Sequence, residues 1–205
     1  MNPSDVTLAT YEAAAVRYRE RGAEVGRPSP LLEFLDRFAA LVGPGAEVLE
    51  LGSGPGRDAL YLERRGLRVK RTDGTNAFVD MMRNDGFDAQ VLDIRTDDLG
   101  GPYAAVLANA VLLHLSRQEF IDTLGRVRRA VVDGAVFAFT VKEGDGGAWS
   151  NDKLDLPRHF TYWREAGVRA ALATTGWIVD SIDHIADRAG RSQPWLFVVA
   201  RPEVR

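Results

Sequence analysis

The sequence predicts a single α/β domain built around a mostly parallel β-sheet. Apolar runs of strand length recur after helical stretches, as in parallel sheets whose strands are connected by helices. The last two runs have no helix between them, which predicts an antiparallel hairpin at one sheet edge. A chain of 205 residues that is 45% hydrophobic fits one core. We expect one domain over residues 1–205, with a helical cap at 1–44 and the sheet-bearing core at 45–205.

Seven apolar runs are the expected strands. They lie at residues 46–51, 67–71, 89–92, 104–108, 135–141, 177–185 and 194–201. The charged segment 187–191 is the expected turn of the final hairpin. Right-handed crossovers between parallel strands place the connecting helices on the faces of the sheet.

Helices are predicted where apolar residues recur three and four positions apart, as at Phe120, Leu124 and Val127. This spacing occurs at residues 58–65, 76–84, 117–132 and 164–175. Two further helices, at about 6–21 and 31–41, precede the first strand. We expect these two to cap one end of the sheet.

Composition excludes several classes of function. The chain has no cysteine, which excludes disulfides, thiolate catalysis and cysteine-based zinc sites, and its three histidines are too scattered to predict a metal site. Charged residues interrupt the first thirty positions, and the longest apolar stretch, 103–115, is too short to span a bilayer. We therefore expect a cytoplasmic protein without a membrane partner. A net charge of −3 gives no general reason to bind nucleic acid.

The most informative motif follows the first strand. Residues 48–60 combine a buried strand, a turn with three alternating glycines and the start of a helix, as at a nucleotide-cofactor site. A dinucleotide fingerprint requires its third glycine where Arg57 stands, so a nicotinamide dehydrogenase is the weaker alternative. Pro55 has no backbone N–H to offer a pyrophosphate. The turn therefore favours a cofactor without phosphates.

The pattern Glu50-x-Gly52-x-Gly54-x-Gly56 resembles the first motif of the class I methyltransferases that use S-adenosylmethionine. The resemblance implies a Rossmann-like three-layer sandwich with a seven-stranded sheet of order 3-2-1-4-5-7-6, in which strand 7 is antiparallel. It also implies that Glu50 holds the methionine ammonium, directly or through water. The cofactor would then lie across the carboxyl ends of strands 1 and 2.

Further segments match the same family in order. Asp73 stands where the family's acidic residue accepts hydrogen bonds from both ribose hydroxyls, and Asp93 resembles the residue that meets the adenine amino group. Segment 103–115 resembles the part beside the sulfonium, and segment 11–18 resembles a helix that folds over the cofactor. The cofactor-binding residues implied by the resemblance are Tyr11, Tyr18, Glu50, Gly52, Ser53, Gly54, Gly56, Asp73, Gly74, Thr75, Asp93, Ile94, Asn109, Ala110 and His114.

Several of these residues also have a simpler, purely structural interpretation. Asp73 also suits a turn before Gly74, and Asp93 also suits a solvated acidic loop. His114 is equally consistent with a histidine that packs near the sheet. Arg158 and Arg191 are interpreted as surface arginines, although both are able to bind an acidic substrate group.

The predicted activity is methyl transfer from S-adenosylmethionine to an O, N or other nucleophile of a small-molecule acceptor, with S-adenosylhomocysteine as product. His114 and His159 are the candidate general bases, and an amine nucleophile needs none. We expect Trp149 to face the substrate, Trp163 to pack in the core, and the glycines at 144–147 to give the preceding segment freedom to move as a lid.

Two other functions stay open. An RNA methyltransferase would share this core, but the acidic composition and the lack of an added basic domain disfavour it. A non-catalytic domain that binds S-adenosylmethionine would keep the glycine turn without a substrate pocket. The sequence predicts neither the acceptor nor the oligomeric state.

Overall fold

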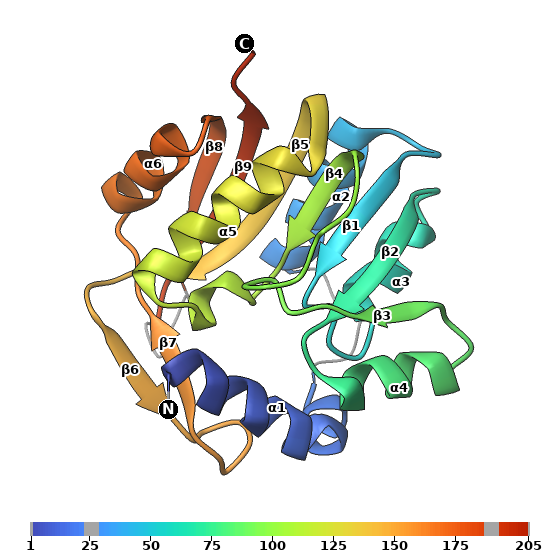
Figure 1. Cartoon of the computed structure of the whole chain (residues 1–205), viewed down its shortest axis with the longest axis vertical. Coiled ribbons are helices and arrows are strands. Elements are labelled where there is room, and N and C mark those ends of the chain that lie inside the picture. Colours follow the sequence, from blue (N-terminus) through green and yellow to red (C-terminus); the bar gives the residue numbers. More distant parts are fainter. Residues whose placement is uncertain (1, 23–28, 187–192, 205) are drawn as a thin grey trace.

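The computed structural model describes residues 2–22, 29–186 and 193–204. Its centre is a seven-stranded sheet of order β3-β2-β1-β4-β5-β9-β8, with helices on both faces (Figure 1). The strands are β1 Glu47–Leu51, β2 Arg68–Asp73, β3 Ala89–Val91, β4 Tyr103–Ala108, β5 Val131–Lys142, β8 Trp177–Ile185 and β9 Trp195–Pro202. When these strands are numbered alone, the order is 3-2-1-4-5-7-6, which confirms the predicted sheet.

The strand directions also agree with the prediction. The pairs β1–β2, β1–β4, β2–β3 and β4–β5 are parallel, whereas β9 is antiparallel to both β5 and β8. The predicted terminal hairpin is therefore confirmed as β8–β9. Its expected turn, residues 187–191, lies outside the described residues.

The helices occupy distinct positions around this sheet (Figure 1). Helices α5 and α6 cover one face, and α2 and α3 cover the other. The helical segments are α1 Pro3–Glu20, α2 Pro30–Val42, α3 Arg57–Glu63, α4 Asn76–Asn84, the 3₁₀ turn η1 Leu112–His114, α5 Arg117–Arg129 and α6 Glu165–Thr174. None of the helices in the described segments has the length and apolarity needed to cross a membrane.

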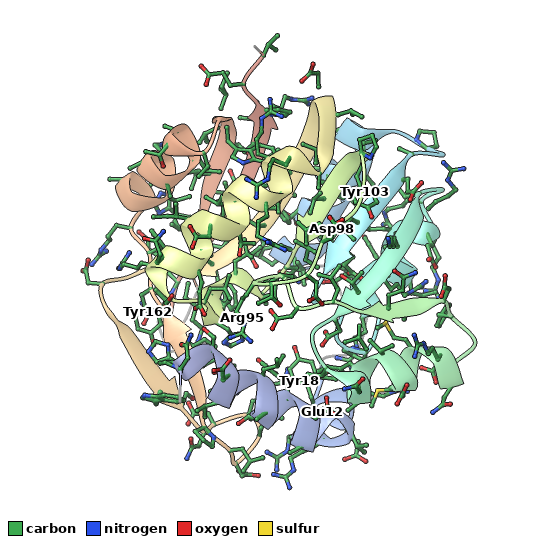
Figure 2. All side chains as sticks on the ribbon, viewed as in Figure 1. Glu12, Tyr18, Arg95, Asp98, Tyr103 and Tyr162 are labelled. Carbon is green, nitrogen blue, oxygen red and sulfur yellow. The ribbon has the colours of Figure 1, made fainter. Side chains whose placement is uncertain are left out.

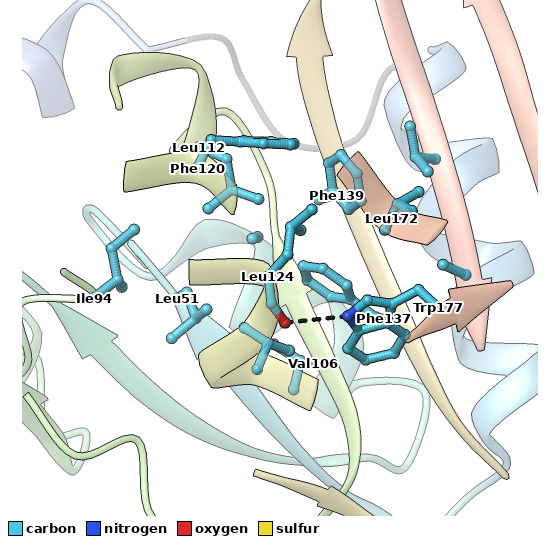
Figure 3. Close-up of a cluster of buried hydrophobic side chains, with 14 of the residues drawn as sticks. Leu51, Ile94, Val106, Leu112, Phe120, Leu124, Phe137, Phe139, Leu172 and Trp177 are labelled. Carbon is cyan, nitrogen blue, oxygen red and sulfur yellow. Dashed lines mark hydrogen bonds between the residues drawn. The ribbon is translucent and has the colours of Figure 1, made fainter. Parts of the chain in front are cut away.

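The larger core lies between the sheet and helices α5 and α6 (Figure 3). Phe120 and Leu124 of α5 pack there with Phe137 of β5. Trp177 adds a buried ring, and its indole N–H donates a hydrogen bond to the Leu124 carbonyl at 3.1 Å. A buried indole N–H needs such a partner, so this bond fixes the orientation of the ring.

The predicted helix at 117–132 is too long. Ser116 and Glu119 form a capping box at its start, but α5 ends at Arg129 and β5 begins at Val131. Val131 pairs with Tyr103 of β4, and two consecutive valines suit a strand better than a helix end. Sheet pairing therefore overrides the apolar spacing that extended the predicted helix.

The two N-terminal helices do not form one cap. Helix α2 lies on a face of the sheet, where Phe34, Leu35 and Phe38 are fully buried. Helix α1 instead crosses the carboxyl ends of the parallel strands (Figure 1). Its buried residues are small or hydroxyl-bearing, so it has no apolar stripe like that of α2.

A second, two-stranded sheet occupies the region where the sequence predicts a lid. Strands β6 Gly147–Ser150 and β7 Arg158–Thr161 pair antiparallel beside α1 (Figure 1). A Cβ atom on Gly147 would come within 2.6 Å of the Phe160 carbonyl oxygen, so this glycine permits close strand pairing. Of the glycines at 144–147, Gly147 therefore begins a strand of this small sheet, whose other strand contacts α1.

Candidate active site

A cavity of about 740 Å³ lies between α1 and the carboxyl ends of β1 to β4. Its volume falls within the usual range for small-molecule sites. Of the fifteen residues predicted to bind the cofactor, all except Glu50 and Gly56 line this cavity. The fold thus brings together segments from five parts of the sequence, and the role of each residue remains a prediction.

The glycine turn forms the floor of the cavity beside β1. Gly52 and Gly54 have φ angles of 69° and 54°, a region that favours glycine. A Cβ atom on Gly52 would also approach Val111 to 2.6 Å, whereas one on Gly54 would meet only Tyr18, at 3.9 Å. The turn is held to β2 by the Ser53 N–H, which donates to the Thr72 carbonyl at 2.8 Å. This arrangement leaves backbone exposed to a ligand.

Asp73 links the glycine turn to the start of α4. One carboxylate oxygen accepts the Gly54 N–H at 2.8 Å, and the other accepts both the N–H and the hydroxyl of Thr75 at 2.9 Å. Burial raises the pKa of Asp73, and these hydrogen bonds oppose that rise. Asp73 therefore makes the turn suggested by the simpler interpretation, and it also lines the cavity.

Two carboxyl groups meet beneath the glycine turn. Glu50 of β1 is 2% exposed, and its Oε2 atom has no hydrogen-bond partner among the described residues. Burial and the nearby charge of Asp58 raise the pKa of Glu50 to about 8. A positive charge placed beside this carboxyl would favour its ionised form and lower the pKa again. Glu50 lies behind the cavity wall, so Asp58, which lines the cavity, is the nearer of the two to a ligand.

Asp58 was not predicted from the sequence. It lies in the first turn of α3 and accepts a hydrogen bond from the Asn109 amide at 2.7 Å. The Asn109 amide is oriented in turn by Thr140, whose hydroxyl donates to the Asn109 Oδ1 atom at 2.7 Å. Burial raises the pKa of Asp58 as well. The sequence signal for Asp58 was an acidic residue just after a glycine turn. This signal is not specific to ligand binding, because an acidic residue also suits the first turn of a helix through the helix dipole.

The opposite side of the cavity holds Asp93 and Ile94. Burial would raise the pKa of Asp93, but hydrogen bonds from the backbone and guanidinium of Arg95 lower it. Arg95 also pairs with Asp5 of α1 at 2.6 Å, and Figure 2 shows it reaching toward that helix. The Asp93 carboxylate is thus engaged with Arg95, and Ile94, 7% exposed, supplies apolar surface. The predicted contact of Asp93 with adenine remains untested.

His114 is fixed from both sides. Its Nδ1 atom lies 2.7 Å from the His159 carbonyl oxygen, which only accepts, so Nδ1 carries the proton. The Nε2 atom therefore accepts from the Tyr11 hydroxyl at 2.9 Å. Burial, together with the charges of Arg158 and Lys142, lowers the pKa of His114 to about 3. His114 is a neutral hydrogen-bond acceptor at the cavity wall and a weak base.

Several residues lie elsewhere than expected. The rings of His159 and Trp149 pack together with centroids 5.1 Å apart, and neither residue lines the cavity. This position does not support His159 as a general base or Trp149 as a substrate contact. Arg158 is 6% exposed and so is no surface arginine, whereas Arg191 lies outside the described residues. Trp163 is 3% exposed, which confirms its predicted place in the core.

Metal binding has no support in the described segments. Among residues 2–22, 29–186 and 193–204, no group of three or more potential metal ligands is placed to hold an ion.

Comparisons with known proteins identify the fold. The structure resembles that of the CcbJ methyltransferase from Streptomyces caelestis, with 20% identity, a TM-score of 0.75, and coverage of 98% of this chain and 100% of the other. It also resembles the Burkholderia thailandensis 1,6-didemethyltoxoflavin-N1-methyltransferase, crystallised with 1,6-didemethyltoxoflavin and S-adenosylhomocysteine. The values are 19% identity, a TM-score of 0.73, and coverage of 100% and 92%.

A third similar structure is the magnesium protoporphyrin IX methyltransferase of Synechocystis PCC 6803 with bound S-adenosylmethionine. It is 14% identical, has a TM-score of 0.75, and the match covers 99% of this chain and 98% of the other. No curated protein matches the sequence significantly. A family model described as a methyltransferase domain matches residues 23–190, most of the chain. The chain therefore belongs to the methyltransferase-domain family, and it has the class I methyltransferase fold that its glycine turn predicted.

Proposed function

We propose that the protein transfers the methyl group of S-adenosylmethionine to an O, N or other nucleophile of a small-molecule acceptor. The observation that carries the proposal is the cavity at the carboxyl ends of β1 to β4, where the glycine turn, Asp73 and Asp58 face one space. Ligands of open α/β sheets bind at this position. The match of the chain to a methyltransferase-domain family supports the same activity.

The residues present fit this cofactor. Asp73 would hold the ribose hydroxyls. Asp58 would hold the methionine ammonium at the cavity wall, and Glu50, whose Oε2 atom has no partner among the described residues, would hold it from behind, directly or through water. Ile94 and Leu92 offer apolar surface to the adenine ring. When bound, the cofactor supplies a methyl group already activated on a sulfonium. The protein need only align the acceptor and exclude water.

The state of His114 limits the acceptor chemistry. A base with a pKa of about 3 gives little driving force for removing a proton from an ordinary alcohol at neutral pH. We therefore propose that His114 orients the acceptor, together with Tyr11, and that the nucleophile is an amine or a group that ionises readily. Because Nδ1 carries the proton, Nε2 is the ring atom that accepts a hydrogen bond, and it faces the Tyr11 hydroxyl.

The volume of the cavity, about 740 Å³, favours a small acceptor. Helix α1 is bonded to both sides of the opening: Asp5 pairs with Arg95 near β3, and the Thr10 hydroxyl donates to the Pro157 carbonyl before β7 at 2.7 Å. The net charge of −3 gives no broad attraction to a polynucleotide. Two enzymes of similar structure are named for small-molecule substrates: the 1,6-didemethyltoxoflavin-N1-methyltransferase and the magnesium protoporphyrin IX methyltransferase.

Two measurements test the proposal. A thermal-shift comparison should show stabilisation by S-adenosylhomocysteine and none by NAD. Incubation with S-adenosylmethionine and a panel of amine, phenol and acid acceptors should then give S-adenosylhomocysteine only in the presence of an acceptor. Binding without turnover across a broad panel would favour the non-catalytic domain, and salt-sensitive tRNA binding would favour the RNA methyltransferase.

A further inference from the structure

Arg158 is a buried cation without an anionic partner among the described residues. It lies on β7 with 6% exposure, and its Nε atom has no hydrogen-bond partner in that part of the chain. Its one side-chain hydrogen bond in the described part of the chain runs from Nη1 to the Tyr11 hydroxyl, at a long 3.4 Å. No described carboxylate lies within ion-pair distance of it. Burying a charge in this way is costly unless a ligand repays the cost.

Two lysines accompany Arg158 and also have no ion pair among the described residues. The Lys142 ammonium lies 3.8 Å from the centre of the Phe160 ring, and the Arg158 guanidinium lies 5.2 Å from the same ring. The Lys153 ammonium lies 3.7 Å from the centre of the Tyr18 ring. Burial, and then the charge of Arg158, lowers the pKa of both lysines. We call Arg158, Lys142 and Lys153 the basic cluster.

The basic cluster lies outside the residues that line the cavity and contacts its wall through Tyr11, so an anion in the cavity reaches Arg158 only by displacing the Tyr11 hydroxyl. Tyr11 lines the cavity, and its hydroxyl contacts both Arg158 and the His114 ring. Phe160, which lies between two members of the cluster, has its ring centre 4.8 Å from that of His114. A molecule whose nucleophile rests at His114 therefore has the positive charges of the cluster beside it.

We propose that the basic cluster binds an anionic group of the methyl acceptor, either a carboxylate or a phosphate. The inference rests on the proposed function, because that function defines the acceptor. The long contact from Arg158 to Tyr11 is weak, and a charge-assisted bond to an anion replaces it favourably. Guanidinium also binds both anions through paired N–H groups. The amino-acid part of the cofactor also carries a carboxylate, so the test must distinguish binding of that carboxylate from binding of the anionic group of the methyl acceptor.

The test is calorimetric titration of the full chain with inorganic phosphate and with acetate, each in the presence and absence of saturating S-adenosylhomocysteine. We expect saturable binding of at least one anion to the S-adenosylhomocysteine complex. In Arg158→Met the affinity should fall about thirtyfold or more, since a buried charge partner is lost. Arg117→Met is the matched control: Arg117 is exposed and also stacks on an aromatic ring, that of Trp163 at 4.5 Å.

Thermal unfolding distinguishes a binding role from a structural one. Arg158→Met keeps the apolar stem and removes the unpaired charge, so the ligand-free variant should melt at the same temperature as the wild type or higher. A lower melting temperature with unchanged anion affinity would show that Arg158 is structural and would overturn the inference.

Two further outcomes also overturn it. One is the absence of anion binding to the wild-type S-adenosylhomocysteine complex. The other combines two observations. S-adenosylhomocysteine abolishes anion binding to the wild type, and Arg158→Met loses affinity for S-adenosylhomocysteine but keeps its affinity for methylthioadenosine, which lacks the amino-acid carboxylate. That result would assign the cluster to the cofactor. Failure of the wild type to bind S-adenosylhomocysteine at all would instead overturn the proposed function, and the same titrations show it.

Discussion

The Glu50→Gln substitution removes the ionisable group that the structure buries beside Asp58. Glutamine keeps the shape of the side chain, but it holds no charge for the methionine ammonium. In the ligand-free protein, burial and the charge of Asp58 hold the Glu50 pKa at about 8, so the carboxyl is mostly protonated at neutral pH. Binding an ammonium favours the carboxylate. Cofactor binding should therefore release a proton from the wild-type protein near neutral pH.

The size of the effect follows from the contact that is lost. A hydrogen bond to a charged group contributes about 1.5–3 kcal/mol, so Glu50→Gln should weaken S-adenosylhomocysteine binding roughly ten- to a hundredfold. Deprotonating Glu50 costs about 1.4 kcal/mol for each pH unit below its pKa. The affinity of the wild type should thus rise relative to that of the variant as the pH approaches about 8.

The same shift predicts the pH dependence of stability. The folded pKa of Glu50 lies above its ordinary value of 4.5, so the folded state binds more protons than the unfolded state between 4.5 and about 8. The contribution of this group to stability is therefore complete below about 4.5, and it is lost as the pH rises through 8. Glu50→Gln should remove this part of the pH dependence and unfold at a higher temperature than the wild type at alkaline pH.

Calorimetry in buffers of different ionisation enthalpy measures both the affinity and the proton release. Glu47→Gln is the matched control, because Glu47 begins the same strand and is exposed. Methylthioadenosine, which has no ammonium, should bind the wild type and Glu50→Gln alike. Equal S-adenosylhomocysteine affinity and equal proton release in the wild type and Glu50→Gln would refute the role of Glu50.

Three further predictions follow from the site and core. Asp73→Asn should weaken S-adenosylhomocysteine binding, measured by calorimetry, about ten- to a hundredfold. It should also lower the melting temperature, since Asp73 accepts three hydrogen bonds, whereas Asp80→Asn, a change at an exposed residue, should have neither effect. The pH profile of kcat/KM should show no ionisation of His114 near 6.5, and an inflection there that His114→Asn removes would contradict its low pKa. Trp177→Phe should cost about 1 kcal/mol in urea unfolding through the lost bond to the Leu124 carbonyl, and an unchanged midpoint would contradict this.

The sequence predicts well those features that depend on neighbouring residues. Strand and helix periods repeat within a few positions, so every strand of the main sheet was found to within a few residues. The glycine turn was equally readable, because the positive φ angles of Gly52 and Gly54 are a local demand of the backbone. Sheet order was predicted through the resemblance that this turn revealed, and the structure confirms it.

The features that were missed depend on contacts between distant parts of the chain. Arg158 is buried because β7 packs against α1, and its contact with Tyr11 spans 147 positions. Asp58 faces the cavity because Asn109, 51 positions away, holds its carboxylate. Neither side chain carries a local signal of burial, since arginine and aspartate are ordinarily exposed. The hairpin β6–β7 was missed for a similar reason, because its strands are short and its glycines suggested freedom rather than close pairing.

Helix α1 differs from α2 in the contacts that attach it to the rest of the protein. An amphipathic helix such as α2 is held by apolar burial, and detaching it costs much free energy. Helix α1 is attached by polar contacts, among them the Thr10 hydrogen bond and the pair of Asp5 with Arg95, and by the packing of its Tyr11 and Tyr18 rings on Phe78. Water replaces the polar contacts at small net cost. We therefore expect α1 to detach at a lower cost in free energy than α2, and because α1 carries Tyr11 to His114, its detachment would open the cavity wall on that side.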